Sequence, residues 1–314
     1  MRAAFSDTLV RLAQADPNVL LLTGDHGYDL FDAFRRHCEK QYINAGIAEQ
    51  NMVGMAAGLA RAGFRPFVYG LSAFVPVRVL EQIKLDVAHD NLPVIFIGDG
   101  AGFVYSHLGT SHQSTEDIAC TRAIPQLSVY SPADRFEVEM CMQAAYDGRS
   151  PAYLRMGKSD RGDVHRAIPQ AARGALLPLA DGPRDGLTFL ATGSLVRTAL
   201  ELARGTYGGA KVYSVPTIKP IDEAQLVAAC VSSQAVVVFE EHSVMGGLGS
   251  VVAEVLAERA PVRVLRIGVA DRFSEHCGSY DYLLREHCLD AAGIAARIDA
   301  FLSAQAAATP RRNG

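Results

Sequence analysis

Short apolar runs alternate with amphipathic stretches along most of this chain, and this alternation limits the folds that the chain can adopt. In the first half, runs with the length of buried strands lie at Val19–Thr23, Tyr42–Ile43, Pro66–Gly70, Pro93–Ile97, Leu127–Tyr130 and Ala152–Leu154. Helical spacing of apolar residues is found between them, at residues 6–15, 30–38, 49–60, 74–89 and 135–146. This order predicts a mostly parallel sheet with helices on both faces.

The alternation stops between Gly157 and Gly186, where Gly, Pro, Arg and Asp are frequent, and then resumes. The later strands are expected at Leu187–Leu190, Lys211–Val215, Ala235–Phe239 and Val262–Arg266, followed by a last helix at Ala291–Leu302. We therefore predict an α/β protein with two doubly wound domains. The expected ranges are 1–158 for the first domain, 159–186 for a linker, 187–304 for a smaller second domain and 305–314 for a disordered tail.

Composition narrows the classes of function. The 314 residues include 30 basic and 34 acidic side chains, which gives a net charge of −4 and does not favour a nucleic-acid partner. Because no apolar run reaches membrane length and the first residues lack a signal-peptide core, we expect a cytoplasmic protein without membrane contact. The six cysteines are scattered without a CxxC pair, so neither a zinc site nor a disulfide framework is predicted.

One carboxylate precedes an unusually small-residue helix. Glu49 follows the turn at Gly46, and Gly54, Ala56, Ala57, Gly58 and Ala60 come after it. Glycines cost roughly 1 kcal/mol each against alanine inside a helix, so close packing must offset them. Glu49 either complements the helix dipole as a first-turn acid or serves chemistry at the helix N-terminus.

Other polar residues lie where strands are expected to end. Asp25 follows the first strand, and the carboxyl ends of strands in open α/β sheets face the ligand crevice, although a turn aspartate is the alternative. Arg155 ends another strand, where its guanidinium suits either a phosphate or an interdomain salt bridge. His107 and His112 lie in a glycine-rich segment and are either proton-transfer groups or surface histidines. Phe74 by itself would be a core aromatic.

Three motifs resemble the transketolase and 1-deoxyxylulose-5-phosphate synthase group of thiamine-diphosphate enzymes. They are Gly46-Ile47-Ala48-Glu49-Gln50, the segment from Thr110 to Ala119 that contains Ser-His-Gln and Glu-Asp-Ile-Ala, and Asp271-Arg272-Phe273-Ser274-Glu275. The resemblance extends over residues 1–304. It implies that the first domain is a pyrimidine-binding domain and that the second is a transketolase C-terminal-like domain used for dimer contacts.

The resemblance also implies roles in cofactor binding. In this family the glutamate at the position of Glu49 hydrogen-bonds N1′ of the aminopyrimidine, and a buried acid suits this role because loss of hydration disfavours its charged form. Phe74 matches the aromatic residue that stacks on that ring. Asp25 matches an aspartate near the thiazolium. Leu71 and Val77 stand where relatives have further aromatics, so the expected pocket is less aromatic than in a typical transketolase.

Substrate contacts are implied in the same way. His112 matches a histidine that contacts substrate hydroxyls and the oxyanion, and His107 lies near a second one. Arg155 matches the arginine that binds the terminal phosphate of the substrate. Arg78 matches an arginine of some relatives, which contacts substrate or pairs with Glu81.

The part of the family that binds the diphosphate is not recognised in this sequence. Gly98-Asp99-Gly100 is not followed by the asparagine that completes the Mg²⁺ motif. We therefore expect one subunit of a split enzyme, with an N-terminal subunit that holds the diphosphate and Mg²⁺, in a dimer of heterodimers. The expected reaction is transfer of a two-carbon ketol unit from a sugar phosphate to an aldehyde. The alternatives are the β subunit of a 2-oxoacid dehydrogenase, a 1-deoxyxylulose-5-phosphate synthase and a non-catalytic scaffold subunit.

Overall fold

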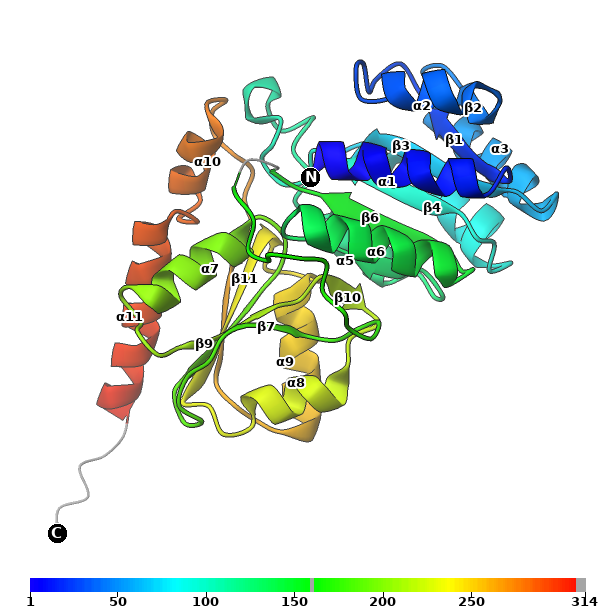
Figure 1. Ribbon diagram of the computed structural model, residues 1–314. Coiled ribbons are helices and arrows are strands. Elements are labelled where there is room, and N and C mark those ends of the chain that lie inside the picture. Colours follow the sequence, from blue (N-terminus) through cyan, green and yellow to red (C-terminus); the bar gives the residue numbers. More distant parts are fainter. Residues whose placement is uncertain (159–160, 309–314) are drawn as a thin grey trace, which may run out of the picture.

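The computed structural model describes residues 1–158 and 161–308 as two α/β lobes, each built on its own sheet (Figure 1). The first sheet has seven strands in the order β10-β5-β6-β4-β3-β1-β2. Their bounds are β1 (Val19–Thr23), β2 (Tyr42–Asn44), β3 (Arg65–Leu71), β4 (Ile95–Asp99), β5 (Ser128–Tyr130), β6 (Ala152–Met156) and β10 (Thr217–Lys219). All neighbours are parallel except β10 and β5, so the predicted mostly parallel sheet is confirmed.

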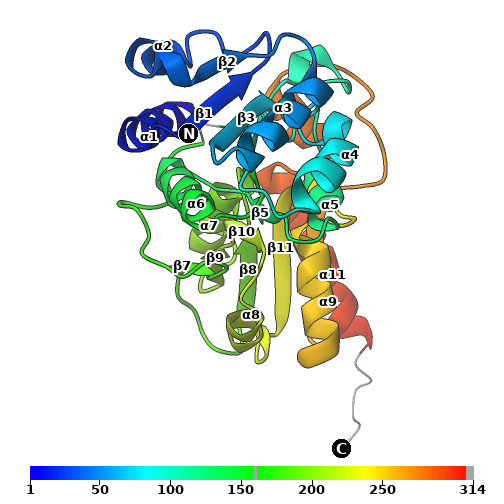
Figure 2. The same cartoon turned by 90° about the vertical axis from the view of Figure 1, so that its right-hand side faces the viewer.

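Helices cover both faces of this sheet. The helical segments are α1 (Arg2–Ala15), α2 (Asp32–His37), a 3-10 turn (Glu39–Gln41), α3 (Glu49–Arg61), a 3-10 turn (Val77–Val79), α4 (Leu80–Gln82), a π-helical turn (Ile83–Ala88), a 3-10 turn (Ser106–Leu108), α5 (Asp117–Arg122) and α6 (Arg135–Asp147). One core joins α1, α2 and α6 to one face, and another joins α3 and the segment after it to the opposite face. Figure 2 shows these two helical layers on either side of the strands. Because both faces are covered, β1, β4 and β6 are buried along their whole length.

The second sheet has five strands in the order β12-β11-β8-β9-β7, with β7 antiparallel to β9 and the other neighbours parallel. The strands are β7 (Leu177–Ala180), β8 (Leu187–Ala191), β9 (Lys211–Ser214), β11 (Ala235–Ser243) and β12 (Val264–Val269). The helices are α7 (Leu195–Arg204), α8 (Glu223–Cys230), α9 (Leu248–Arg259), α10 (Tyr280–Glu286) and α11 (Ala291–Ala308). α8 and α9 pack on one face, whereas α7, α10 and α11 pack on the other.

The two lobes are joined more closely than a linker would allow. After β9 the chain returns to the first lobe, where β10 adds an antiparallel strand beside β5. The core beneath α3 also continues through Ile118 and Leu127 to Leu190 and Val236 of the second sheet. The lobes therefore share both a sheet and a hydrophobic core.

Four boundary predictions need correction. The helix expected at 74–89 begins later, at Val77, and continues to Ala88 through consecutive 3-10, α and π turns. The later start is explained by Pro76, which has no amide proton and disfavours helical geometry at Val75 before it. β7 lies inside the range expected as a linker, and its Pro178 is tolerated because β7 is an edge strand. β10 was not predicted, since three residues carry no clear period. α11 continues to Ala308, so residues 305–308 are helical, and the rest of the expected tail, 309–314, lies outside the described residues.

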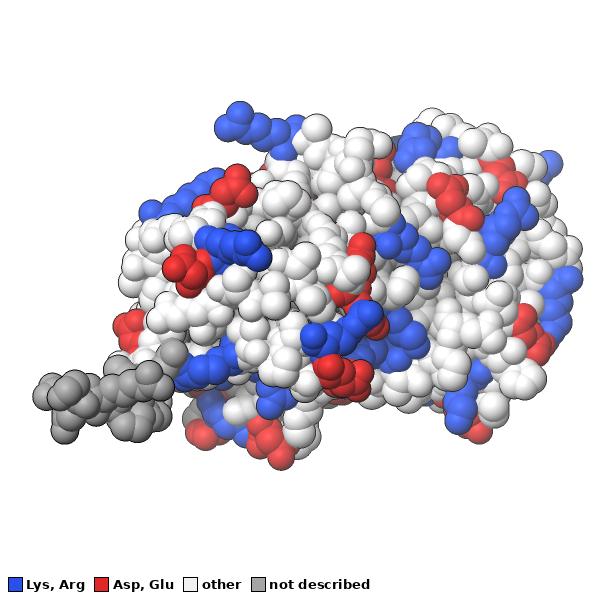
Figure 3. All heavy atoms as spheres, turned by 90° about the horizontal axis from the view of Figure 1, so that it is seen from below, with Lys and Arg blue, Asp and Glu red and all other residues white. Residues whose placement is uncertain are grey.

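On one face of the molecule, charges of both signs are dispersed. Figure 3 shows acidic and basic side chains interspersed on the face seen from below rather than gathered by sign. An example is the exposed ion pair between Arg259 of α9 and Glu223 of α8. Among the described residues, no helix has the length and apolar character needed to cross a membrane.

Candidate active site

Glu49 is placed at the first position of α3 by a sharp turn after β2. The side chain of Asn44 accepts a hydrogen bond from the Gly46 amide at 2.8 Å, and Gly46 adopts a left-handed φ of 72° that favours glycine. The turn brings Glu49 into the protein, where only 5% of the residue is exposed. A buried carboxylate needs a partner, because burial removes its hydration.

That partner is Arg78, from the 3-10 turn Val77–Val79. Its Nη1 donates to Glu49 Oε2 at 3.1 Å. The Cζ atom of the same guanidinium lies 4.1 Å from the centroid of the Phe74 ring, in a cation–π contact. Arg78 therefore contacts Glu49 rather than Glu81, which was one of the two alternatives that the sequence left open, and it joins Glu49 to Phe74.

Phe74 in turn contacts His112. The two ring centroids are 5.4 Å apart with an interplanar angle of 66°, an edge-on arrangement. His112 is half-buried, and its Nδ1 lies 3.0 Å from the hydroxyl of Ser111. Four of the residues singled out in the sequence thus form one continuous group, which we call the Glu49 cluster: Glu49, Arg78, Phe74 and His112.

A buried polar network behind the Glu49 cluster fixes the two segments that carry its rings. The hydroxyl of Ser72, two residues before Phe74, donates to that of Ser114, two residues after His112, at 2.8 Å. Tyr153 donates to Asp117 at 2.6 Å and lies 2.9 Å from the Ser72 hydroxyl. Burial, reinforced by the Asp117 carboxylate, raises the pKa of Tyr153, so its hydroxyl stays protonated as a donor. The sequence showed no signal for this network, because its members are far apart along the chain.

Arg155 belongs to that network and not to an open pocket. It is 2% exposed, and its Nε donates to the two carboxylate oxygens of Asp117 at 2.8 and 3.1 Å. Its Nη2 donates to the backbone oxygens of Ser114 and of Glu241 in the second lobe. The expectation that Arg155 binds a substrate phosphate is therefore corrected, because the guanidinium is enclosed and paired. Its salt bridge is with Asp117 of the same lobe rather than between the domains, and only the hydrogen bond to the Glu241 backbone reaches the second lobe.

The remaining candidate residues lie outside the Glu49 cluster. Asp25 is exposed after β1, accepts a hydrogen bond from Tyr28 at 2.5 Å and lines a cavity of about 170 Å³ together with Arg35. Leu71 is half-buried at the end of β3, and its carbonyl accepts the amide of Phe74. His107 is exposed on the turn Ser106–Leu108.

Asp99, in the glycine-rich loop, is occupied by structural bonds. It is 3% exposed, and its carboxylate accepts the hydroxyl of Tyr69 at 2.7 Å and lies 3.4 Å from Arg2 Nε. Within the described residues, no group of three or more His, Cys, Asp and Glu side chains is arranged to hold a metal ion.

Three consecutive residues of β11, Glu240, Glu241 and His242, are buried and make structural hydrogen bonds. Glu240 accepts the amides of Leu248 and Gly249 at the start of α9, and burial raises its pKa to about 7. Burial lowers the pKa of His242 to about 4, so the ring is neutral and its Nε2 accepts the Ala119 amide from the first lobe. His242 and Glu241, which accepts the Phe103 amide, therefore join the lobes, whereas Glu240 bonds within the second lobe. All three lie in a part of the chain for which no catalytic role is predicted.

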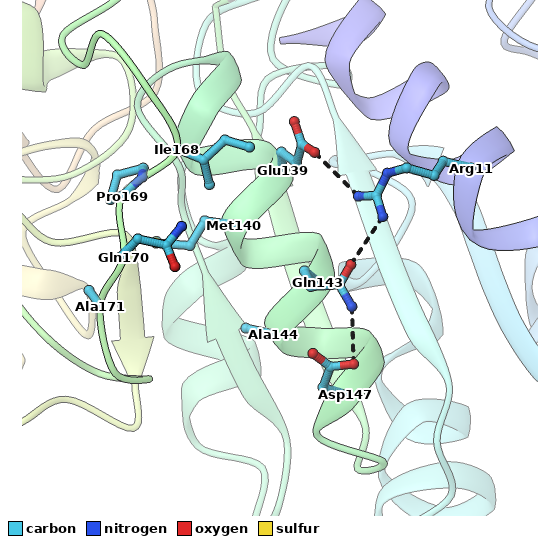
Figure 4. A pocket seen from close by; sticks show the side chains of 10 residues that line it. All are labelled: Arg11, Glu139, Met140, Gln143, Ala144, Asp147, Ile168, Pro169, Gln170 and Ala171. Carbon is cyan, nitrogen blue, oxygen red and sulfur yellow. Dashed lines mark hydrogen bonds and ion pairs between the residues drawn. The ribbon is translucent and has the colours of Figure 1, made fainter. Parts of the chain in front are cut away.

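A separate cavity of about 480 Å³ lies on the opposite side of the first sheet, between α1, α6 and residues 168–171. Figure 4 shows Arg11 pointing from α1 to Glu139 and Gln143 on α6, and Gln143 donating to Asp147. None of its lining residues belongs to the Glu49 cluster.

Comparison with known proteins matches both lobes to one family. Residues 1–162 match the transketolase pyrimidine-binding domain, and residues 179–294 match the transketolase C-terminal domain. A 6-deoxy-6-sulfo-D-fructose transketolase subunit from a Clostridium species is 35% identical over 300 residues, 94% of this chain and 92% of its own length. One of the subunits of an apulose-4-phosphate transketolase from Phocaeicola vulgatus is 34% identical over 298 residues, 93% and 94% of the two chains.

A solved structure supports the same assignment. It is described as a split-gene transketolase in an inactive beta4 tetramer, and it superimposes with a TM-score of 0.86 at 33% identity. The match covers 96% of this chain and 97% of that one. On these grounds the chain belongs to the transketolase family and comprises its pyrimidine-binding and C-terminal domains.

Proposed function

We propose that this chain is the C-terminal subunit of a two-component transketolase that depends on thiamine diphosphate. The observation that carries the proposal is the Glu49 cluster, in which a buried carboxylate lies beside an aromatic ring and a histidine. The two relatives described above are named as transketolase subunits and have nearly the same length as this chain.

The residues of the cluster fit the aminopyrimidine of the cofactor. That ring is flat, apolar on its faces and polar at its edge. Phe74 offers a flat apolar wall, and Glu49 is a carboxyl group that already hydrogen-bonds a planar nitrogen cation over that wall. When bound, thiamine diphosphate supplies the nucleophilic carbon that cleaves a ketose between C2 and C3.

Each residue then has a defined task. Glu49 holds the proton at N1′ of the aminopyrimidine, and its burial strengthens that hydrogen bond by excluding water. Phe74 orients the ring by stacking. His112 exchanges a proton with a substrate hydroxyl or carbonyl oxygen, because an imidazole can give and take protons near neutral pH. Asp25, Leu71 and His107 would line the rest of the cofactor and substrate site.

A partner subunit would complete the site. We propose that an N-terminal transketolase subunit holds the diphosphate and Mg²⁺, and that two such pairs form a dimer of heterodimers in the cytoplasm. The split-gene relative is described as inactive when assembled as a beta4 tetramer, which supports dependence on a partner. The donor would be a ketose with an anionic group, since the named relatives act on sulfonated and phosphorylated sugars.

The test is a mixing experiment. Two-carbon transfer from ketose-phosphate donors to an aldose is measured with Mg²⁺ and thiamine diphosphate, using this chain, an N-terminal transketolase subunit from the same organism, and both together. Transfer by the mixture only is expected. Decarboxylation of a 2-oxoacid by the mixture would instead indicate a dehydrogenase component, and no reaction with any donor would favour a scaffold.

A further inference from the structure

The guanidinium of Arg78 lies where the proposed function needs another group. Its Nη1 is 3.1 Å from Glu49 Oε2, and its Cζ is 4.1 Å from the centroid of Phe74. The proposed function places Phe74 on one face of the aminopyrimidine and Glu49 at its edge. Because the guanidinium of Arg78 contacts both residues, it lies on the face of the Phe74 ring that is nearest to the Glu49 carboxylate.

Resting on the proposed function, we propose that Arg78 is a displaceable placeholder for the aminopyrimidine ring. A guanidinium is flat, stacks on aromatic faces and donates N–H groups in its own plane to a carboxylate. A pyrimidine that carries a proton on N1′ makes the same two contacts. Arg78 and the cofactor ring therefore compete for one place, and the cofactor binds only when Arg78 leaves.

The surroundings of Arg78 and Glu49 differ in the way that a displaceable contact requires. The side chain of Arg78 is 42% exposed and lies in the three-residue 3-10 turn Val77–Val79. It can therefore turn into solvent, where water replaces the contacts that its guanidinium loses. The side chain of Glu49 is only 7% exposed and is fixed at the start of α3. A buried carboxylate without a partner raises the free energy of the protein. The incoming ring must therefore take the place of Arg78 at Glu49 as Arg78 leaves.

The placeholder has a consequence for affinity. The apparent dissociation constant of the cofactor is the intrinsic value divided by the fraction of molecules in which Arg78 has moved away. Arg78 thus keeps the buried carboxylate paired before the cofactor arrives and weakens cofactor binding in return. This is opposite to the effect of an arginine that contacts substrate or cofactor, which strengthens binding.

Binding by substituted proteins tests the proposal. Thiamine diphosphate with Mg²⁺ is titrated by calorimetry into this chain assembled with its N-terminal subunit. Arg78→Leu should lower the dissociation constant by roughly three- to tenfold, the sum of a cation–π contact and a half-exposed ion pair. Arg61→Leu is the matched control, since Arg61 is similarly exposed and pairs with Asp90 at the far end of α3. An unchanged or raised dissociation constant for Arg78→Leu overturns the placeholder.

A second measurement uses the wild-type assembly, so it does not depend on the folding of a variant. Modification of Arg78 by phenylglyoxal is followed by mass spectrometry with and without thiamine diphosphate and Mg²⁺. Displacement into solvent should increase the rate of modification on cofactor binding, whereas a decrease overturns the placeholder. If the cofactor binds but Arg78 is protected, only this inference fails. If the wild-type assembly binds no cofactor, the proposed function fails with it.

Discussion

The hydroxyls of Ser72 and Ser114 lie 2.8 Å apart and hold the end of β3 against the loop that carries His112. Both side chains are fully buried. Because Phe74 follows Ser72 by two residues and His112 precedes Ser114 by two, this bond sets how the two rings of the Glu49 cluster meet.

Substitution of Ser114 by alanine is expected to loosen that arrangement. Loss of one buried hydrogen bond should lower the free energy of unfolding by about 1 kcal/mol. It should also lower kcat/KM of the assembled enzyme, since His112 is then less well positioned. Urea unfolding and steady-state rates measure the two effects. Ser303→Ala on the exposed surface of α11 is the control and should change neither. Full activity in Ser114→Ala would show that the bond does not position His112.

Glu49→Gln tests the central residue of the site. The amide keeps the shape of the side chain but has neither the negative charge nor the exchangeable acid proton that stabilises a proton at N1′, so kcat with the partner present should fall by about 100-fold or more. Glu258→Gln, on the exposed side of α9, is the matched control. If Glu49→Gln turns over at the rate of the wild type, the assignment of Glu49 is wrong, provided that both variants unfold at the same urea concentration.

Arg155→Leu is expected to affect stability rather than recognition of phosphate. The substitution leaves Asp117 as a buried, unpaired carboxylate, which should cost about 3–5 kcal/mol. Arg197→Leu breaks an exposed pair with Glu201 and should cost no more than about 0.5 kcal/mol. Thermal unfolding compares the two. A selective rise in KM for phosphorylated donors, without loss of stability, would restore Arg155 as a phosphate ligand.

His242 predicts a loss of stability in acid. In the unfolded chain the imidazole binds a proton near its ordinary pKa of about 6.5, but in the fold it stays neutral down to about pH 4. Between these values the unfolded state binds more protons, so the free energy of unfolding decreases as the pH falls, by about 3 kcal/mol in all. His242→Gln should lack this part of the pH dependence. Equal slopes of unfolding free energy against pH for the two proteins would contradict this prediction. Glu240 lies 3.7 Å from His242 but is present in both proteins, so the comparison isolates the imidazole.

The sequence predicted the fold well where the local pattern is strong. β1, β4 and β11 contain short continuous apolar runs of strand length, and α3 is marked by its small residues, so these elements can be identified before any tertiary contact is known. β10 was missed because its place is decided by pairing with β5, a contact between residues about 90 positions apart. The start of the next helix at Val77 rather than at Phe74 follows from Pro76, which has no amide proton.

The sequence singled out residues of the candidate site but could not predict their contacts. Motif resemblance pointed to Glu49, Phe74, Arg78 and His112, and the fold brings them together. It could not indicate that Arg78 pairs with Glu49, since that choice depends on the turn Val77–Val79 facing the start of α3. Nor could it show that Arg155 is enclosed, because Asp117 and Glu241 reach it from distant parts of the chain.

Because of strand β10, the two lobes of this chain cannot be exchanged or separated independently. A domain that can be transferred to another protein must contain all the strands of its sheet. Here the edge strand of the first sheet, β10, comes after β9 of the second lobe in the chain. Exchange of the first 158 residues between relatives would therefore leave β5 paired with a foreign strand. The gene for such an enzyme can be divided ahead of this chain, whereas a division between its two lobes would separate a sheet from its own border.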